Sequence, residues 1–519
     1  MTNGTIVNIK DLKDQSIDVP TSVTEDMHSH DSLWVKTLQF LRFVGPSILI
    51  SVGYIDPGNW ATDIQGGSNY GYSLIWVQVV SNVLAIILQT LAARMGLVTG
   101  KSLAQNCAMF YPKPISFMLW VMAELAIAST DLAEVLGTAI GLKLLFNLPM
   151  IWGVVLTAFD TLLLLVFQNC GHRFMETLIF IFMAGICGCF VVETFFAKPD
   201  PVGILRGLVP TLHPGSLSTA TGILGATIMP HNIYLHSGLM VSRRSKSKVI
   251  TQRRCLFAVI ELLFSLNIAL FVNAAILVVA AATFYGKIEV SDIRLAAILL
   301  ESHFGKAASI VFGVALLLAG QSSTITGTIA GEIVMDGFLN IRLPSYLRRM
   351  LTRGVAIIPA VIIILSVGEA TTTSMLVWSQ VVLSIQLPFA IIPLIRITSN
   401  DIMGEFKNRI FFKVSGWVCV VLVVALNVWM VFDTMTDNLQ QSPWWLWVIV
   451  IFFAILFVIF TGYVTFCKIE ERKEIKQITY INTDSGIPGT KIILPTEAGP
   501  SEETKNEHSS LLPGYSLNN

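Results

Sequence analysis

The segment Ser51–Asp63, SVGYIDPGNWATD, sets a carboxylate and a helix-breaking pair inside an apolar run that begins near Leu41. Asp56 lies at about the depth where a membrane-spanning helix is most apolar, and a carboxylate there costs roughly 2.5–3.5 kcal/mol on insertion scales. Pro57 removes a backbone donor and the following glycine loosens the chain, so the pattern predicts a broken helix. Backbone carbonyls freed in mid-membrane must face protein or a water-filled cavity. Oxygen atoms gathered around a cavity suit a cation, and the alternative is a proline kink with polar caps.

A second interruption, Gly225–Asn232, GATIMPHN, lies within another largely apolar span, 216–242. Paired interruptions in the two halves of a chain indicate the binding site of a transporter. Met229 adds a thioether to the oxygen set, and sulfur prefers softer transition-metal ions to magnesium or calcium. The alternative is that Met229 only fills space. Together the two interruptions predict a transporter with a cation site at mid-membrane.

The composition is that of a polytopic membrane protein: 54% of the 519 residues are hydrophobic and 13% are charged, against about 25% charged residues in soluble domains. The net charge is zero and the basic residues do not form one surface, so nothing supports a nucleic-acid partner. Spans of about 20 apolar residues predict about twelve helices, near 41–64, 73–98, 115–142, 149–168, 174–197, 216–242, 256–284, 303–330, 351–368, 371–395, 410–434 and 443–467.

Lysine and arginine gather in the links that follow the sixth, eighth and tenth spans, whereas links on the opposite side, such as 434–443, hold none. The exception is the longer link 285–309, with Lys287, Arg294 and Lys306. Because positive residues concentrate in cytosolic loops, we expect both termini to lie in the cytosol.

The third span carries three acidic residues, Glu124, Asp131 and Glu134, whose spacings of seven and three place them near one helix face. Acids along one stripe of a membrane helix are typical of a proton relay. The candidate cationic partners are His231, His236, Arg244 and Arg353. The alternative is a set of salt bridges that only joins the helices.

These segments resemble the natural resistance-associated macrophage protein (NRAMP) family of proton-coupled divalent transition-metal transporters. The resemblance runs from about Leu41 to Ile397 and rests on GYIDPGNWATDIQGGSNYGYSL, ASTDLAEVLGTAI, GATIMPHNIYLHS, GQSSTITGTIAGE and SQVVLSIQLPFAIIPL. It implies an all-α polytopic membrane fold with a LeuT-like 5+5 inverted repeat and broken helices 1 and 6. The expected parts are a cytosolic N-terminal tail (1–40), a first repeat (41–200), a second repeat (201–400), helices 11 and 12 (401–468) and a C-terminal tail (469–519).

The resemblance also implies the residues of the site. The Asp56 and Asn59 side chains, the Ala226 carbonyl and the Met229 sulfur would bind Fe²⁺ or Mn²⁺, and Gln380 would approach the metal in one conformational state. For Gln380 the alternative is interhelical hydrogen bonding. Protons would pass from Asp56 through Glu134 and Asp131 towards the cytosol, with His231 as a further candidate.

Two other classes of function remain open on the sequence. A broken-helix transporter of amino acids or other organic solutes would hold a substrate carboxylate at its half-helix N-termini, where Asp56 would repel it unless a coupling cation intervened. An enzyme or receptor is the weaker alternative, because the chain has no GxSxG or HEXXH motif and no phosphate-binding glycine loop. No cofactor is expected.

Beyond the twelfth span the sequence is polar, and we expect 470–519 to be disordered. Glu507, Leu511 and Leu512 resemble a dileucine address that clathrin adaptors read in a cytosolic tail. The address predicts an endosomal, lysosomal or vacuolar membrane more than the plasma membrane.

Overall fold

The computed structural model describes residues 33–168, 172–245, 247–287, 293–341, 345–438 and 444–469, which contain helices and turns and no strand. The α-helices are α2 (Leu33–Phe43), α3 (Pro46–Gly53), α4 (Pro57–Tyr70), α5 (Ile75–Thr99), α6 (Leu103–Phe110), α7 (Lys113–Phe146), α8 (Met150–Gln168), α9 (His172–Ala197), α10 (Pro201–Gly207), α11 (Leu217–Thr227), α12 (Pro230–Val241), α13 (Lys248–Phe284), α14 (Ile293–Phe304), α15 (Lys306–Leu339), α16 (Ser345–Val367), α17 (Thr372–Thr398), α18 (Ile410–Asn438) and α19 (Trp444–Phe466). Three short 3₁₀ helices connect them: η2 (Gly71–Leu74), η3 (Glu369–Thr371) and η4 (Asp401–Phe406).

Each of the twelve predicted spans coincides with one long helix or with a broken pair, so the predicted all-α polytopic fold is confirmed. The first span is the pair α3 and α4, and the sixth is the pair α11 and α12. The sequence analysis missed the short helices outside the spans, α2, α6, α10 and α14. These helices are shorter than the run of about 20 apolar residues by which the spans were recognised.

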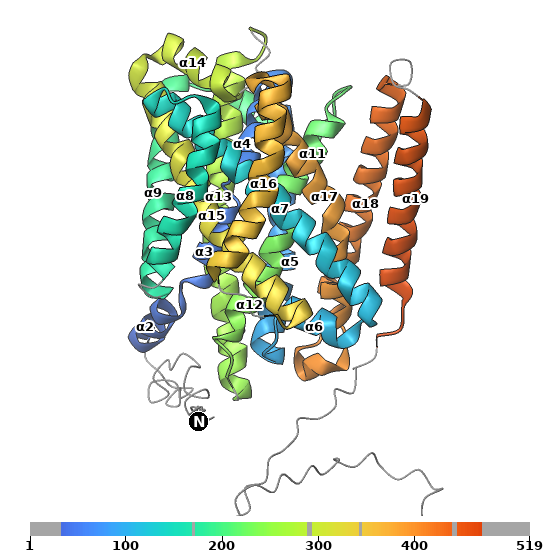
Figure 1. The fold of residues 1–519 in the computed structure, drawn as a ribbon. Helices are drawn as coiled ribbons and strands as arrows, with labels where there is room; N and C mark the ends of the chain where they lie inside the picture. The colour runs from blue at the N-terminus through green and yellow to red at the C-terminus, as the bar shows by residue number, and fades with distance from the viewer. Residues whose placement is uncertain are drawn as a thin grey trace, which may run out of the picture. The chain divides into compact units, whose positions relative to one another are not determined.

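The two broken helices run in opposite directions. Figure 1 shows α3 below α4 and α11 above α12, so the chain rises through the first pair and descends through the second. α3 packs against α12, and α4 packs against α11, which brings the two breaks to the same level. This antiparallel pairing is the arrangement expected of an inverted repeat.

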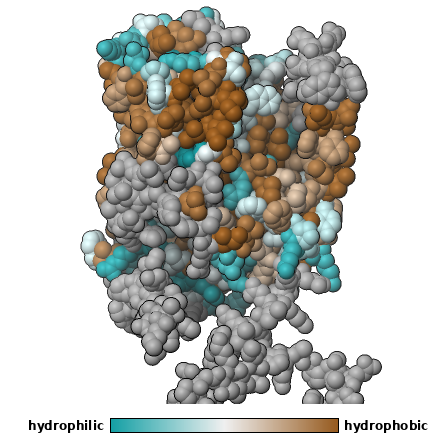
Figure 2. All heavy atoms as spheres, viewed as in Figure 1, coloured by the Kyte–Doolittle hydropathy of each residue, from teal (hydrophilic) through white to brown (hydrophobic). Residues whose placement is uncertain are grey.

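The outer surface has the polarity of a membrane protein. Figure 2 shows hydrophobic residues across the middle of the visible face and hydrophilic residues towards its two ends. Large apolar side chains such as Phe264, Ile362 and Phe453 are at least 59% exposed. Among the described residues, eight helical stretches are long and apolar enough to cross a membrane, with shorter apolar helices at 150–159 and 352–367.

α7 is the helix on which the two halves of the chain meet, because it contacts α4, α15, α16 and α17. Two glycines permit the close approach of α7 to Pro57 of α4 and to α15. A side-chain carbon at Gly137 would run into the ring of Pro57, and one at Gly320 of α15 would run into the Thr138 hydroxyl. Small residues at such crossings let membrane helices pack closely, so the break at Pro57 is seated directly on α7.

At the end of the bundle opposite α2, Glu369 of η3 joins three segments. Its carboxylate pairs with Lys143 of α7 and with Arg294 NH1 of α14 at 2.9 Å, and Arg294 NH2 donates to its backbone carbonyl at 3.1 Å. The hydrogen bond from Lys143 holds the pKa of Glu369 below its usual value. Any stabilisation from this pairing is therefore present at neutral pH and is lost only as the pH falls through that lowered pKa.

Replacing Gly137 by alanine should destabilise the protein by about 1–3 kcal/mol, because the added methyl group overlaps Pro57 in a packed interior. The melting temperature of the purified protein in detergent measures this. Gly188→Ala is the matched control, since a methyl group there would meet no described atom within 4 Å outside its own stretch of helix backbone. Equal melting temperatures for the two variants would contradict the close packing of Pro57 on α7.

Candidate functional site

The first break spans Tyr54–Asp56, between the end of α3 at Gly53 and the start of α4 at Pro57. Pro57 occupies the first turn of α4, where a missing N–H leaves no bond unmade. Asp56 is extended (φ −71°, ψ 161°) and caps α4, its Oδ1 accepting from the Asn59 backbone N at 3.0 Å and from Asn59 Nδ2 at 2.6 Å. The proline and the aspartate thus produce the break that the sequence predicted.

The second break lies at Ile228 and Met229, between α11 and α12. Ile228 leaves the helical region (φ −99°, ψ 74°), Met229 is extended, and Pro230 opens α12. Asn59 Nδ2 donates across to the Ala226 carbonyl at 3.1 Å. A single amide group therefore joins the Asp56 carboxylate of the first break to a carbonyl of the second.

The remaining predicted ligands are buried close to these atoms. Asp56, Met229 and Gln380 are each 0% exposed. A side-chain carbon at Gly58 would meet both the Gln380 amide and Asp56 Oδ2, so α17 brings Gln380 beside the carboxylate. Gln380 Nε2 donates to Ser379 Oγ at 2.9 Å, which turns the amide of Gln380 partly to its own helix.

The site carries an uncompensated negative group. Asp56 Oδ2 and Gln380 Oε1 accept no hydrogen bond from any described residue, and no described basic side chain pairs with Asp56. A buried carboxylate without a cationic partner is strongly disfavoured unless it is neutralised. Met229 Sδ lies 3.4 Å from Asn232 Nδ2. The arrangement therefore brings together one carboxylate, neutral oxygens and one sulfur at a position where a cation or a proton would neutralise the carboxylate.

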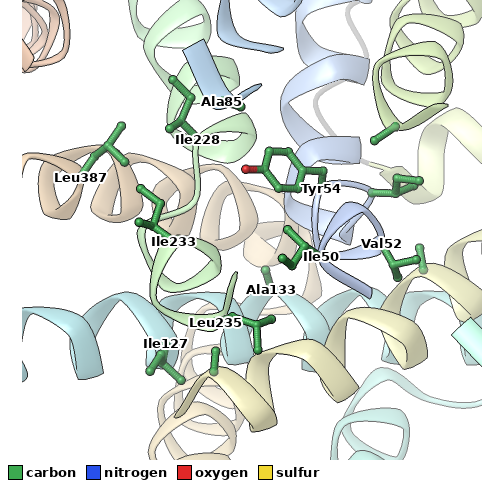
Figure 3. Close-up of a cluster of buried hydrophobic side chains, with 14 of the residues drawn as sticks. Ile50, Val52, Tyr54, Ala85, Ile127, Ala133, Ile228, Ile233, Leu235 and Leu387 are labelled. Atoms are coloured by element: carbon green, nitrogen blue, oxygen red, sulfur yellow. The ribbon is translucent and has the colours of Figure 1, made fainter. Parts of the chain in front are cut away.

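Apolar side chains enclose the two breaks. Figure 3 shows Ile228 and Ile233 around the α11–α12 break, between Leu387 of α17 on one side and Tyr54 and Ile50 of the α3–α4 break on the other. Ile50, Ile228 and Ile233 are no more than 1% exposed. Such surroundings exclude water and strengthen electrostatic interactions within the site.

Of the four candidate partners of the acidic stripe, Arg353 is the one that meets it. Arg353 NH2 lies 3.7 Å from Glu134 Oε2 and donates to Thr324 Oγ1 at 2.6 Å, and NH1 donates to the Asp131 carbonyl at 3.4 Å. Gly327 of α15 leaves room beside both carboxylates. Glu124 lies further along α7, where it accepts from Trp120 Nε1 at 3.0 Å.

The other three candidates lie elsewhere on α12 or beyond its end. His231 Nδ1 lies 3.2 Å from Thr130 Oγ1, so it contacts α7 at the residue before Asp131. His236 Nδ1 lies 2.9 Å from Gln89 Oε1 of α5, in the role of an interhelical histidine. Arg244 is exposed and packs against Gly100 at the end of α5.

Sequence reasoning missed a hydrogen-bonded chain that ends at the first break. Gln78 Nε2 donates to Asp63 Oδ1 at 2.6 Å and to the Asn273 carbonyl at 3.2 Å, and Asn273 Nδ2 donates to the Tyr54 carbonyl at 2.9 Å. This chain links α4, α5 and α13 to one of the carbonyls that the break exposes. One indication of this chain was visible in the sequence: Asp63, Gln78 and Asn273 are each a polar residue within an apolar span.

A second missed residue is Glu261 of α13. Its Oε1 accepts from the backbone N of Gly45 at 2.7 Å and of Ser47 at 2.9 Å, at the N-terminus of α3. A carboxylate there satisfies N–H groups that have no partner within the helix and interacts favourably with the helix dipole. Glu261 therefore anchors the half of the broken helix that leads into the Asp56 site.

Known proteins resemble this chain over most of its length. Residues 47–433 match the family described as Natural resistance-associated macrophage protein-like. The chain is 48% identical to a divalent metal cation transporter MntH from Nostoc sp. over 438 residues, which is 83% of this chain and 97% of that protein. It is 46% identical to a natural resistance-associated macrophage protein 2 homolog from Dictyostelium discoideum over 448 residues, 85% of this chain and 71% of that protein.

The fold resembles a solved transporter. A crystal structure of the Eremococcus coleocola manganese transporter, in complex with an aromatic bis-isothiourea substituted compound, has a TM-score of 0.76 and 34% sequence identity. The match covers 84% of this chain and 95% of that one.

Replacing Glu261 by glutamine should loosen the start of α3, because it turns two charge-assisted hydrogen bonds into neutral ones that contribute roughly half as much. We expect faster hydrogen–deuterium exchange at the amides of Gly45 and Ser47. Glu332→Gln on α15 serves as the control, because Glu332 Oε1 accepts no hydrogen bond from any described residue. Unchanged exchange at both amides would rule out Glu261 as the anchor.

Proposed function

Because the chain belongs to the NRAMP family, we propose that it carries divalent transition-metal ions across its membrane by alternating access, with Mn²⁺ and Fe²⁺ as substrates. The family resemblance noted in the sequence is confirmed by these matches. As a member of a transporter family the chain is not an enzyme, as the sequence analysis predicted. Similar proteins carry the names divalent metal cation transporter and manganese transporter.

The observation that best supports a metal site is the contact of one Asn59 amide with both Asp56 Oδ1 and the Ala226 carbonyl. Asn59 Nδ2 lies 2.6 Å from the first oxygen and 3.1 Å from the second, so both oxygens face one position at which a small cation could be held. A half-turn of the amide would present Asn59 Oδ1, a metal ligand, in place of its nitrogen. The Met229 sulfur then favours transition ions over Mg²⁺ and Ca²⁺.

The same geometry supports the proposal of alternating access. α4 and α11 lie on one side of the breaks and α3 and α12 on the other, so each pair can open or close one approach to the ion. Gln380 stands beside Asp56 on α17 and could replace a ligand as the helices move. Transport directed to the cytosol, from outside or from an acidic lumen, completes the proposal.

We further propose that protons are cotransported through α7. Asp56, His231, Glu134 and Asp131 form the route, because His231 contacts Thr130, and Arg353 lies beside the Glu134 carboxylate and donates to the Asp131 backbone carbonyl. The positive charge of Arg353 stabilises the ionised carboxylate of Glu134 after its proton has left. Glu124 lies beyond them on the same helix, and Arg244 remains a cationic candidate near that end.

Uptake into proteoliposomes tests the metal site. Under an inward proton gradient, wild-type protein should accumulate Mn²⁺ and Fe²⁺ but neither Ca²⁺ nor amino acids, and Asp56→Ala should be inactive. Met229→Ala should reduce discrimination against Ca²⁺ on the order of tenfold, because it removes the soft ligand. Met118→Ala, on the exposed face of α7, should leave uptake unchanged. Accumulation of an amino acid without metal would instead support an organic-solute transporter.

The proton route is tested by Glu134→Gln, which keeps the shape of the side chain but cannot release a proton. With a pH-sensitive dye inside the vesicles, we expect Mn²⁺-driven acidification to fall to background in this variant. Glu301→Gln on α14 should acidify like the wild type. If Glu134→Gln acidifies normally while transporting Mn²⁺, the protons take another route.

We propose an endosomal, lysosomal or vacuolar membrane with both termini cytosolic. The sorting residues Glu507, Leu511 and Leu512 lie outside the described residues. Changing both leucines to alanine should move a fluorescently tagged protein to the plasma membrane and abolish capture by clathrin adaptors. The same distribution for both forms would show that this address is not used.

A further inference from the structure

A basic cavity lies at the end of the bundle where α5 ends and α13 begins. It has a volume of about 440 Å³ and is closed by η4 and the start of α18. Its charged lining consists of Arg94, Lys248, Lys407, Arg409 and Glu405. Asp401 pairs with Lys407 from outside the lining, so four positive charges stand against two negative charges and leave an excess of two. A cavity of this size is in the range of small-ligand sites.

Three of the four basic groups already have partners within the chain, whereas the fourth is available to a ligand. Arg94 NH2 donates to the Phe406 carbonyl at 2.7 Å, and its guanidinium lies 5.3 Å from the centre of the Phe412 ring. Lys248 pairs with Glu405, and Lys407 pairs with Asp401 at 2.7 Å. Arg409 has no acidic partner among the described residues. The positive charges of the lining that no described acidic residue neutralises are thus the guanidinium groups of Arg94 and Arg409.

One wall of the cavity continues into the apolar outer surface. Leu256 and Val259 of α13 line it together with Phe412 of α18. Leu256 is 57% exposed, and Phe264, two turns further along the same face of α13, is 67% exposed. A ligand whose charged part fills the cavity could therefore lay an acyl chain along α13.

We propose that this cavity binds the headgroup of a phosphorylated phosphatidylinositol. One phosphomonoester of such a lipid contributes roughly −1.5 to −2 at neutral pH, which matches the two guanidinium groups of Arg94 and Arg409. Basic pockets at the cytosolic end of membrane helices are suited to such headgroups. The bound lipid would connect α5, α13 and η4 at the end where α3 and α12 lie. The site is separate from the Asp56 site and adds lipid recognition to the proposed transport.

The test is native mass spectrometry of the full-length protein with dioctanoyl phosphatidylinositol 4-phosphate, dioctanoyl phosphatidylserine and soluble inositol bisphosphate. We expect the phosphoinositide to bind more tightly than either competitor, because only it combines the high charge with an acyl chain. Arg409→Gln and Lys407→Gln should each weaken it about fivefold. Lys413→Gln is the matched control, since Lys413 is an exposed lysine on α18 outside this cavity.

Equal affinity for phosphatidylserine would overturn the proposal, since the excess of charge would then confer no selectivity. Inositol bisphosphate binding as tightly as the lipid would reassign the cavity to a soluble phosphate ligand. Equal weakening by Lys413→Gln would show attraction to the general surface charge. We expect Arg409→Gln to take up Mn²⁺ at the wild-type level in vesicles of neutral lipid. This measurement distinguishes a loss of lipid binding from a loss of the proposed transport.

Discussion

The structure depends on the meeting of two unwound helices inside an apolar environment. Backbone groups freed within a membrane have no water to satisfy them, so each break persists only where other groups supply partners. Here Asn273 donates to the Tyr54 carbonyl, and Asn59 donates to the Ala226 carbonyl and to Asp56. These donors are neutral amides, which satisfy the carbonyls without neutralising the carboxylate. The negative charge of Asp56 is thereby left for a ligand.

The rest of the bundle holds the broken halves in register. Gly137 lets Pro57 sit directly on α7, and Glu261 anchors the start of α3. At the opposite end, Glu369 connects α7 and α14 through Lys143 and Arg294. The long helices therefore form a frame that the contacts of Glu261 and Glu369 stabilise at its two ends. In its interior, Asp56 pairs with no basic side chain among the described residues, whereas Glu134 of α7 lies 3.7 Å from Arg353 NH2.

The sequence was sufficient to predict the two breaks and the twelve spans. Proline, glycine and a buried aspartate act on the local backbone, and each span shows as a run of apolar residues. It could not select Arg353 from four cationic candidates, since helix periodicity gives the face of a residue but not the helix it meets. Glu261 and Asp63 were missed for the same reason. The hydrogen-bond partners of Glu261 lie more than 200 residues away in the chain. Gln380 was assigned by resemblance alone, and its place beside Asp56 is visible only once Gly58 and α17 are seen together.

The central claim is that one ion is held between the two breaks by Asp56, Asn59, the Ala226 carbonyl and Met229. Anomalous diffraction at the manganese absorption edge from crystals soaked in Mn²⁺ tests it most directly. The account predicts a single strong peak between the two breaks, bonded to the Met229 sulfur and to all three oxygen ligands, with Asn59 presenting its oxygen. A peak at Asp131 and Glu134 instead, or one that leaves Met229 unbonded, would contradict it.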